Sequence, residues 1–106
     1  MIVVTSETIA NKRIVRTLGI VRGNTIRARH IGKDILAGLR NIVGGEVHEY
    51  AKLIAESREQ SLDRMVDEAT TLGANAIVAT RFTTSVMMGG AAELLAIGTA
   101  VVVEDA

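Results

Sequence analysis

Apolar residues at steps of three and four between Gly44 and Gly73 predict one long helix, around which the rest of the chain is arranged. Glycine suits the left-handed position that closes a helix, so we expect Gly73 to follow its last turn. At about 1.5 Å of rise per residue the helix spans roughly 40 Å, enough to cover a whole sheet or to reach a neighbouring molecule. The predicted buried stripe consists of Val47, Ala51, Ile54, Leu62, Met65, Ala69 and Leu72.

One charged residue interrupts this stripe. Arg58 falls at the helical step where the stripe should continue, and Ser57 and Ser61 border it. Either its stem lies along apolar surface while the guanidinium reaches water, or the guanidinium is buried and paired with a carboxylate, because burying an unpaired charge is costly. For the second alternative we expect Glu93 as the partner, since it is the only acid in the first half of the last predicted strand.

Runs with an alternating or continuous apolar pattern predict strands on both sides of the long helix. Gly23-Asn24 is typical of a turn and is expected to end the second strand, while residues 25–31 fit either a strand extension or an extended connector. Helical spacing predicts a short helix at residues 32–43, and Met88-Gly89-Gly90-Ala91 predicts a hairpin turn. The four strands are expected at residues 1–4, 12–22, 74–88 and 92–104.

The last predicted strand determines the expected topology, because both of its faces are apolar and such a strand is buried on two sides. We therefore place it in the centre of a three-stranded antiparallel sheet, with the long helix on one face and a short N-terminal strand and short helix added. This is an α+β fold. One helix leaves the second face without cover, and another subunit is expected to cover it. Strict alternation assigns one face of the second strand to Ile14, Arg16, Leu18, Ile20 and Arg22.

Composition narrows the function classes. The 106 residues fit one domain, over residues 1–106, and one Phe and one Tyr leave an aliphatic core. Twelve basic and twelve acidic residues give no net charge, so we expect neither nucleic acid nor a membrane surface as a partner. The chain has no cysteine for a disulfide or a thiolate metal site. No signal-peptide pattern and no membrane-length apolar run is evident, so the cytoplasm is the expected location.

Residues that could bind a metal ion or an anion lie where the long helix begins. Glu46 and Glu49 are three residues apart and share a helical face, while His48 points elsewhere. These three are the candidate metal ligands, and they require further ligands from another segment or subunit. The alternative is a solvated first turn whose carboxylates favour the positive end of the helix. Gly44 and Gly45 offer backbone N–H groups to an anion, but the lysine and glycine spacing of a phosphate loop are missing.

No nucleophilic triad or dinucleotide fingerprint is evident, so no cofactor is assigned. The serines lack a neighbouring pattern of histidine and acid. The candidates for a buried ion pair or a ligand site are Arg58, Glu93, Arg40, Gly44, Gly45 and Glu46.

Three segments, GLRNIVGGE (38–46), LGANAIV (72–78) and AELLAIGTAVVVE (92–104), stand at fixed spacing with Tyr50, Ser57-Arg58, the LDRM run at 62–65 and Arg81-Phe82. With this spacing the chain resembles, over nearly its whole length, the YbjQ-like family, whose members are often labelled heavy-metal-binding proteins. The resemblance implies a small, dodecin-like α+β subunit that assembles as a ring, typically a homopentamer. It implies no established activity. Ile97 stands where the family usually has a tyrosine, so a site that needs this phenol is not expected.

Two functions remain open. The first is a non-enzymatic, ring-forming protein that binds a metal ion or small ligand or serves as a scaffold. The alternative is an enzyme whose active site lies between subunits, around Arg58 and Glu93. The absence of a catalytic constellation favours the first, and the sequence names neither ligand nor pathway.

Overall fold

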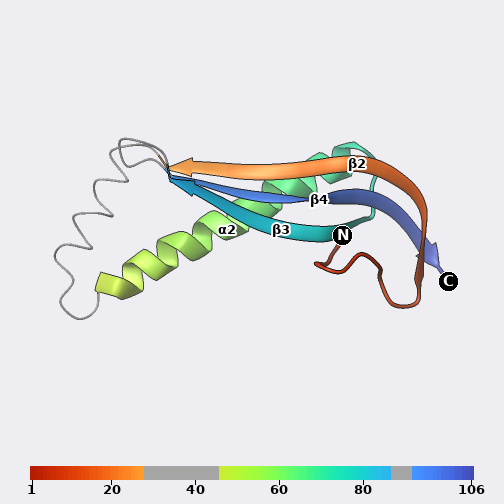
Figure 1. Ribbon diagram of the computed structural model, residues 1–106, viewed down its shortest axis with the longest axis horizontal. Helices are drawn as coiled ribbons and strands as arrows, with labels where there is room; N and C mark the ends of the chain where they lie inside the picture. Colours follow the sequence, from red (N-terminus) through yellow and green to blue (C-terminus); the bar gives the residue numbers. More distant parts are fainter. Residues whose placement is uncertain (28–45, 87–91) are drawn as a thin grey trace.

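The computed structural model describes residues 1–27, 46–86 and 92–106, apart from the side chains at positions 27, 46–53, 86 and 92. The described residues form an α+β fold in which one long helix lies along one side of a sheet (Figure 1). The predicted short helix at residues 32–43 and the predicted hairpin turn lie outside the described residues. The elements are β1 (Ile2–Val3), β2 (Lys12–Arg27), α2 (Glu46–Thr71), β3 (Ala76–Val86) and β4 (Ala92–Asp105).

The sheet has the strand order β1-β3-β4-β2, which confirms the central position predicted for the last strand. β4 is antiparallel to both β2 and β3. The two flanking strands therefore run in the same direction with β4 between them, a split β-α-β arrangement. β1 pairs with β3 in parallel. The sheet of four strands is thus mixed, and its three long strands form the antiparallel arrangement that the sequence predicts.

Glycine at position 23 does not end the second strand, as the sequence suggested; β2 continues to Arg27. The reason is a close approach of the helix. A Cβ atom on Gly23 would lie 2.2 Å from the carbonyl oxygen of Ser61 and 2.4 Å from the backbone nitrogen of Met65. Only a residue without a side chain permits this crossing, so Gly23 marks a contact between helix and sheet and not a turn.

Two irregularities in β2 also change which of its residues share a face. Register shifts occur between Ile14 and Arg16 and between Thr17 and Gly19. Because each extra residue turns the following side chains to the other face, strict alternation is wrong here. Leu18 packs against the core beneath the helix, whereas Ile20 lies on the opposite face.

The helix buries a stripe that differs from the predicted one. Its buried positions recur at steps of four, and two of them are serines. Ile54 and Leu72, expected to be buried, are 40% and 47% exposed. α2 diverges from the strands toward its N-terminal end (Figure 1), and Ile54 belongs to this half of the helix. The buried residues of the described part of the helix are Ser57, Ser61, Met65 and Ala69.

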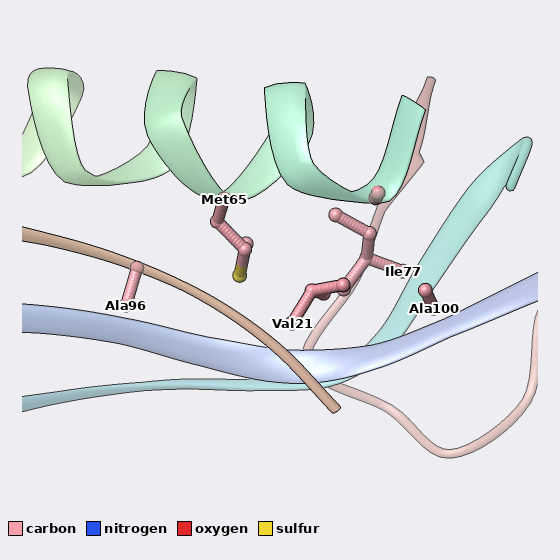
Figure 2. Packing of buried hydrophobic residues seen from close by; sticks show 6 residues of the cluster. Val21, Met65, Ile77, Ala96 and Ala100 are labelled. Carbon is pink, nitrogen blue, oxygen red and sulfur yellow. The ribbon is translucent and has the colours of Figure 1, made fainter. Parts of the chain in front are cut away.

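The core beneath the helix is small and aliphatic, as the composition predicts. Met65 reaches down from α2 toward Val21 of β2 and Ile77 of β3 (Figure 2), and Ala69 of α2 belongs to the same buried cluster. Ala96 and Ala100 of β4 complete this cluster, and small residues on the central strand let the helix lie close to it. Burial of this kind supplies most of the stability of a helix in a protein.

Gly73 ends the helix as predicted. Its φ angle is 87°, in the left-handed region. The N–H group of Gly73 donates to the carbonyl oxygen of Thr70, and that of Ala74 donates to Ala69, both at 3.0 Å. This pair of bonds is the Schellman motif, which satisfies carbonyl groups at a helix end.

Among residues 1–27, 46–86 and 92–106, only part of the sheet face opposite α2 is covered. A second cluster of buried residues lies there, formed by Ala76, Val78, Val101 and Val103. The N-terminal segment packs over it through Ile2, Val4 and Ile9.

Candidate functional site

The remainder of this uncovered side is the candidate site, and we call it the open face. Val21 and Gly23 point toward the helix, so Arg22 between them points away from it. Arg22 is in register with Ile97 of β4, which is in register with Arg81 of β3. The next two rows of the open face, in the order β2, β4, β3, are Asn24, Leu95 and Thr83, then Ile26, Glu93 and Ser85.

Aliphatic side chains give the open face its apolar character. Ile20 is 60% exposed and Ile26 is 56% exposed. Leu95 and Ile97, on the central strand, are half-buried. Isolated exposed apolar residues are ordinary, but a contiguous group on one sheet face is typical of an interaction site.

Two arginines carry the positive charge of the open face. Arg22 and Arg81 are both exposed, and Nη1 of Arg81 donates to the carbonyl oxygens of Thr5 (2.7 Å) and Thr80 (2.8 Å). Neither arginine pairs with a carboxylate among the described residues, whose ion pairs are Lys12–Asp105 and Arg13–Glu104. The sequence analysis missed this pair of arginines, because only the register across β4 brings them into one row.

Glu93 lies on the open face, but its expected partner does not. Its carboxylate accepts a hydrogen bond from Nδ2 of Asn24 at 3.1 Å. Arg58 is exposed on α2, on the other side of the sheet. Of the two alternatives for Arg58, burial within the subunit is therefore excluded, and the described residues show no ion pair between it and Glu93. Ser57 and Ser61 occupy the inward positions, so Arg58, about 100° further around the helix from Ser57, turns outward.

Ser61 is tolerated at an inward position because the sheet offers its hydroxyl partners. Oγ of Ser61 donates to the carbonyl oxygen of Leu94 at 3.0 Å and lies 3.4 Å from Oγ1 of Thr25. Another buried hydroxyl, Oγ1 of Thr80, has no hydrogen-bond partner in the described part of the chain. It lies at an irregularity of β3 where Ala79 has a φ angle of 54°.

Side chains of α2 cover part of the outer edge of β2. Nη1 of Arg64 donates to the carbonyl oxygen of Asn24. Oε2 of Glu68 accepts the backbone N–H of Arg22 at 3.3 Å. These two backbone groups point away from β4, where an added strand would need them. Covering an edge in this way opposes pairing with another strand, so the open face and not this edge is free for a partner.

An ion pair closes the far end of the β2–β4 ladder. Nζ of Lys12 lies 2.5 Å from Oδ1 of Asp105. The hydrogen bond and the positive charge of Lys12 hold the pKa of the Asp105 carboxyl below its ordinary value. Both groups lie at the surface, so the pair adds little stability.

The candidate metal ligands cannot be assembled from the described side chains. Glu46 is the first residue of α2, and the side chains of Glu46, His48 and Glu49 lie outside the described ones. Arg40, Gly44 and Gly45 also lie outside the described residues. Among the side chains that are described, no three from His, Cys, Asp and Glu stand close enough to hold a metal ion. Within the described residues, no helix has both the length and the apolarity to cross a membrane.

Comparison with known proteins gives consistent matches over the whole chain. A UPF0145 protein of Methanosarcina acetivorans is 56% identical over 101 residues, covering 95% of each chain. A UPF0145 protein of Dehalococcoides mccartyi is 55% identical over 104 residues, covering 98% of this chain and 100% of the relative. Such identity over the full length establishes common descent and a common fold.

A solved structure supports the fold independently. A protein of unknown function from Pediococcus pentosaceus, assigned to the DUF74 family, superimposes with a TM-score of 0.64. The alignment covers 98% of both chains at 13% identity, so this likeness concerns the fold alone. The family model that matches residues 1–104 is YbjQ, described as "Putative heavy-metal-binding". The chain therefore belongs to the YbjQ-like family of UPF0145 proteins.

Proposed function

We propose that this chain is the subunit of a ring-forming cytoplasmic protein, preferably a homopentamer, with a non-enzymatic binding or scaffolding role. The observation that carries the proposal is the open face, where Ile20 and Ile26 are more than half exposed. Burying a side chain of this size is worth about 1.5–3 kcal/mol. A second copy of the chain is a partner that is always present at sufficient concentration. Contacts between copies give a ring when the rotation from one subunit to the next closes.

The binding role concerns a metal ion or a small ligand held between subunits. The family description names heavy metals, and the side chains at the start of α2 supply oxygen and nitrogen ligands that copies in a ring bring together. The alternative of an enzyme with a site around Arg58 and Glu93 has less support, because within a subunit the two residues lie on opposite sides of the sheet.

The mass of the protein in solution tests the proposal. Light scattering at micromolar concentration, with native mass spectrometry for the subunit number, should give one closed oligomer of five subunits. Ile26→Asp should shift the population toward the monomer, because it places a charge on the open face. Leu72→Asp is the matched control: Leu72 is 47% exposed at the end of α2 and should leave the mass unchanged. A stable wild-type monomer would refute the proposal.

The binding role requires a second measurement. Crystals of protein purified without a chelator should show ligand or metal density between subunits. If the crystals show no such density and the oligomers take up no metal during dialysis, the binding role is refuted and only the scaffolding role remains.

A further inference from the structure

The outer side of α2 is acidic. Glu56, Glu59, Asp63 and Asp67 follow one another at steps of three and four, so they form one stripe along the helix. This acidic stripe points away from the sheet, because Ser57, Ser61 and Met65 occupy the opposite side of the helix. All four carboxylates belong to exposed residues, and none forms an ion pair with another described residue.

The open face has the opposite charge. Arg22 and Arg81 flank Ile97 in one row, and neither has a carboxylate partner among the described residues. The whole chain has no net charge. Its charges are nevertheless separated: the acidic stripe lies on the helix layer, while the open face carries two arginines and a single carboxylate, that of Glu93, among aliphatic side chains.

We propose that copies of this chain join head to tail, with the acidic stripe of one copy docked on the open face of the next. The inference rests on the proposed self-assembly and specifies its geometry. The two surfaces lie on opposite sides of a two-layer molecule, so one copy cannot bring its own charges together. Two different surfaces in contact make a heterologous interface, which closes into a ring when the rotation permits.

A further observation agrees with this docking. The alternative of adding a strand at the edge of β2 is opposed by the side chains of Arg64 and Glu68 that already cover it.

Charge reversal tests the docking. A sheet variant carries Arg22→Glu and Arg81→Glu, and a helix variant carries Glu59→Arg and Asp63→Arg. Either change replaces attraction with repulsion, so we expect the concentration at which half of the protein is dissociated to rise about ten-fold or more. A chain with all four substitutions restores opposite charges at every contact and should assemble as the wild type does.

Mixing experiments separate this geometry from others. The sheet variant mixed with the helix variant should form joint oligomers in which the two variants alternate, because each supplies the surface that the other needs. A ring of five leaves one contact between like variants, so this mixture should assemble less tightly than wild type. The sheet variant mixed with wild type still offers its acidic stripe to wild-type open faces but no matching open face, so closed mixed rings should not form. If two sheets faced each other, this mixture would instead restore full assembly, and that result would overturn the inference. Arg16→Glu with Arg58→Glu is the control: both arginines are exposed and lie outside the two docking surfaces.

Each negative result refutes a different part of the proposal. A wild-type monomer would refute the self-assembly itself. A wild-type oligomer whose mass and midpoint are unchanged by the sheet variant and the helix variant, both folded by circular dichroism, would overturn the head-to-tail docking alone. An oligomer that is lost in either variant but not regained in the chain with four substitutions would overturn it as well.

Discussion

Replacing Gly23 by alanine is the most direct test of how α2 lies on the sheet. The two nearest contacts of the added Cβ, at 2.2 Å and 2.4 Å, are backbone atoms of Ser61 and Met65, which cannot rotate away. Because ordinary contact begins at 3.4 Å, the helix would have to retreat from β2 by about 1 Å. A retreat of this size forfeits roughly a quarter to a half of the dispersion energy across the contact.

The expected loss in the free energy of unfolding follows from the side chains buried beneath the helix. Val21 and Met65 are fully buried at this crossing, and burying each is worth about 1.5–3 kcal/mol. Losing part of this energy, together with an overpacking strain of about 1–3 kcal/mol, lowers the free energy of unfolding by about 3 kcal/mol. Gly98→Ala is the matched comparison. Its Cβ would lie 2.6 Å from Cγ2 of Ile77, a methyl group that can shift, so we expect about 1–2 kcal/mol.

Urea unfolding followed by circular dichroism measures both losses. The stability of an oligomer depends on protein concentration, so all variants are compared at the same two concentrations. A Gly23→Ala protein within about 0.5 kcal/mol of wild type would show that the helix does not cross β2 as closely as described. A larger loss for Gly98→Ala than for Gly23→Ala would equally contradict the reasoning.

Three further predictions concern single features. Ser61→Ala leaves the carbonyl oxygen of Leu94 without its donor and should lower the free energy of unfolding by about 1–2 kcal/mol; no change in the urea midpoint would mean that this bond contributes nothing. Arg58→Met should change the free energy of unfolding by less than about 0.5 kcal/mol, because Arg58 is exposed; a loss of several kcal/mol would show that assembly buries it. Metal-stripped protein should show no tight, stoichiometric Zn²⁺, Cu⁺ or Cd²⁺ binding at neutral pH by isothermal titration, because the chain has no cysteine; a metal held between subunits, as proposed above, should then be a harder ion bound weakly by oxygen ligands. A sub-micromolar site abolished by His48→Ala would contradict this.

The long elements and the central strand were predictable from the sequence because each has a strong pattern of its own. α2 runs from Glu46 to Thr71, with Gly73 closing it, and β4 is apolar on both faces and central. These features depend on neighbours within a few residues. The expected ring and its subunit number are not of this kind, and they remain predictions.

The sequence-based predictions that the structure contradicts fail for one reason: they depend on contacts between segments far apart in the chain. Gly23 is typical of a turn in the sequence, and only its contact with Ser61 of the helix shows that it lies within a strand. Serine counts as polar in a helical pattern. The sequence therefore places the buried stripe at Arg58, whereas the buried positions are Ser57 and Ser61. The irregularities in β2, which turn Leu18 and Ile20 to opposite faces, have no signal in local alternation. For the same reason the row of Arg22 and Arg81 became visible only with the register of the sheet.

The position of β4 has a consequence for synthesis of the chain. β2 pairs with β4 and with no other described strand, and the Lys12–Asp105 contact at one end of this ladder joins residues 93 positions apart. During translation β2 therefore remains unpaired on its inner edge until β4 has left the ribosome. Such distant pairing folds slowly, and an unpaired strand with exposed isoleucines is open to wrong partners. Nascent chains stalled before β4 is synthesised should therefore be held by chaperones.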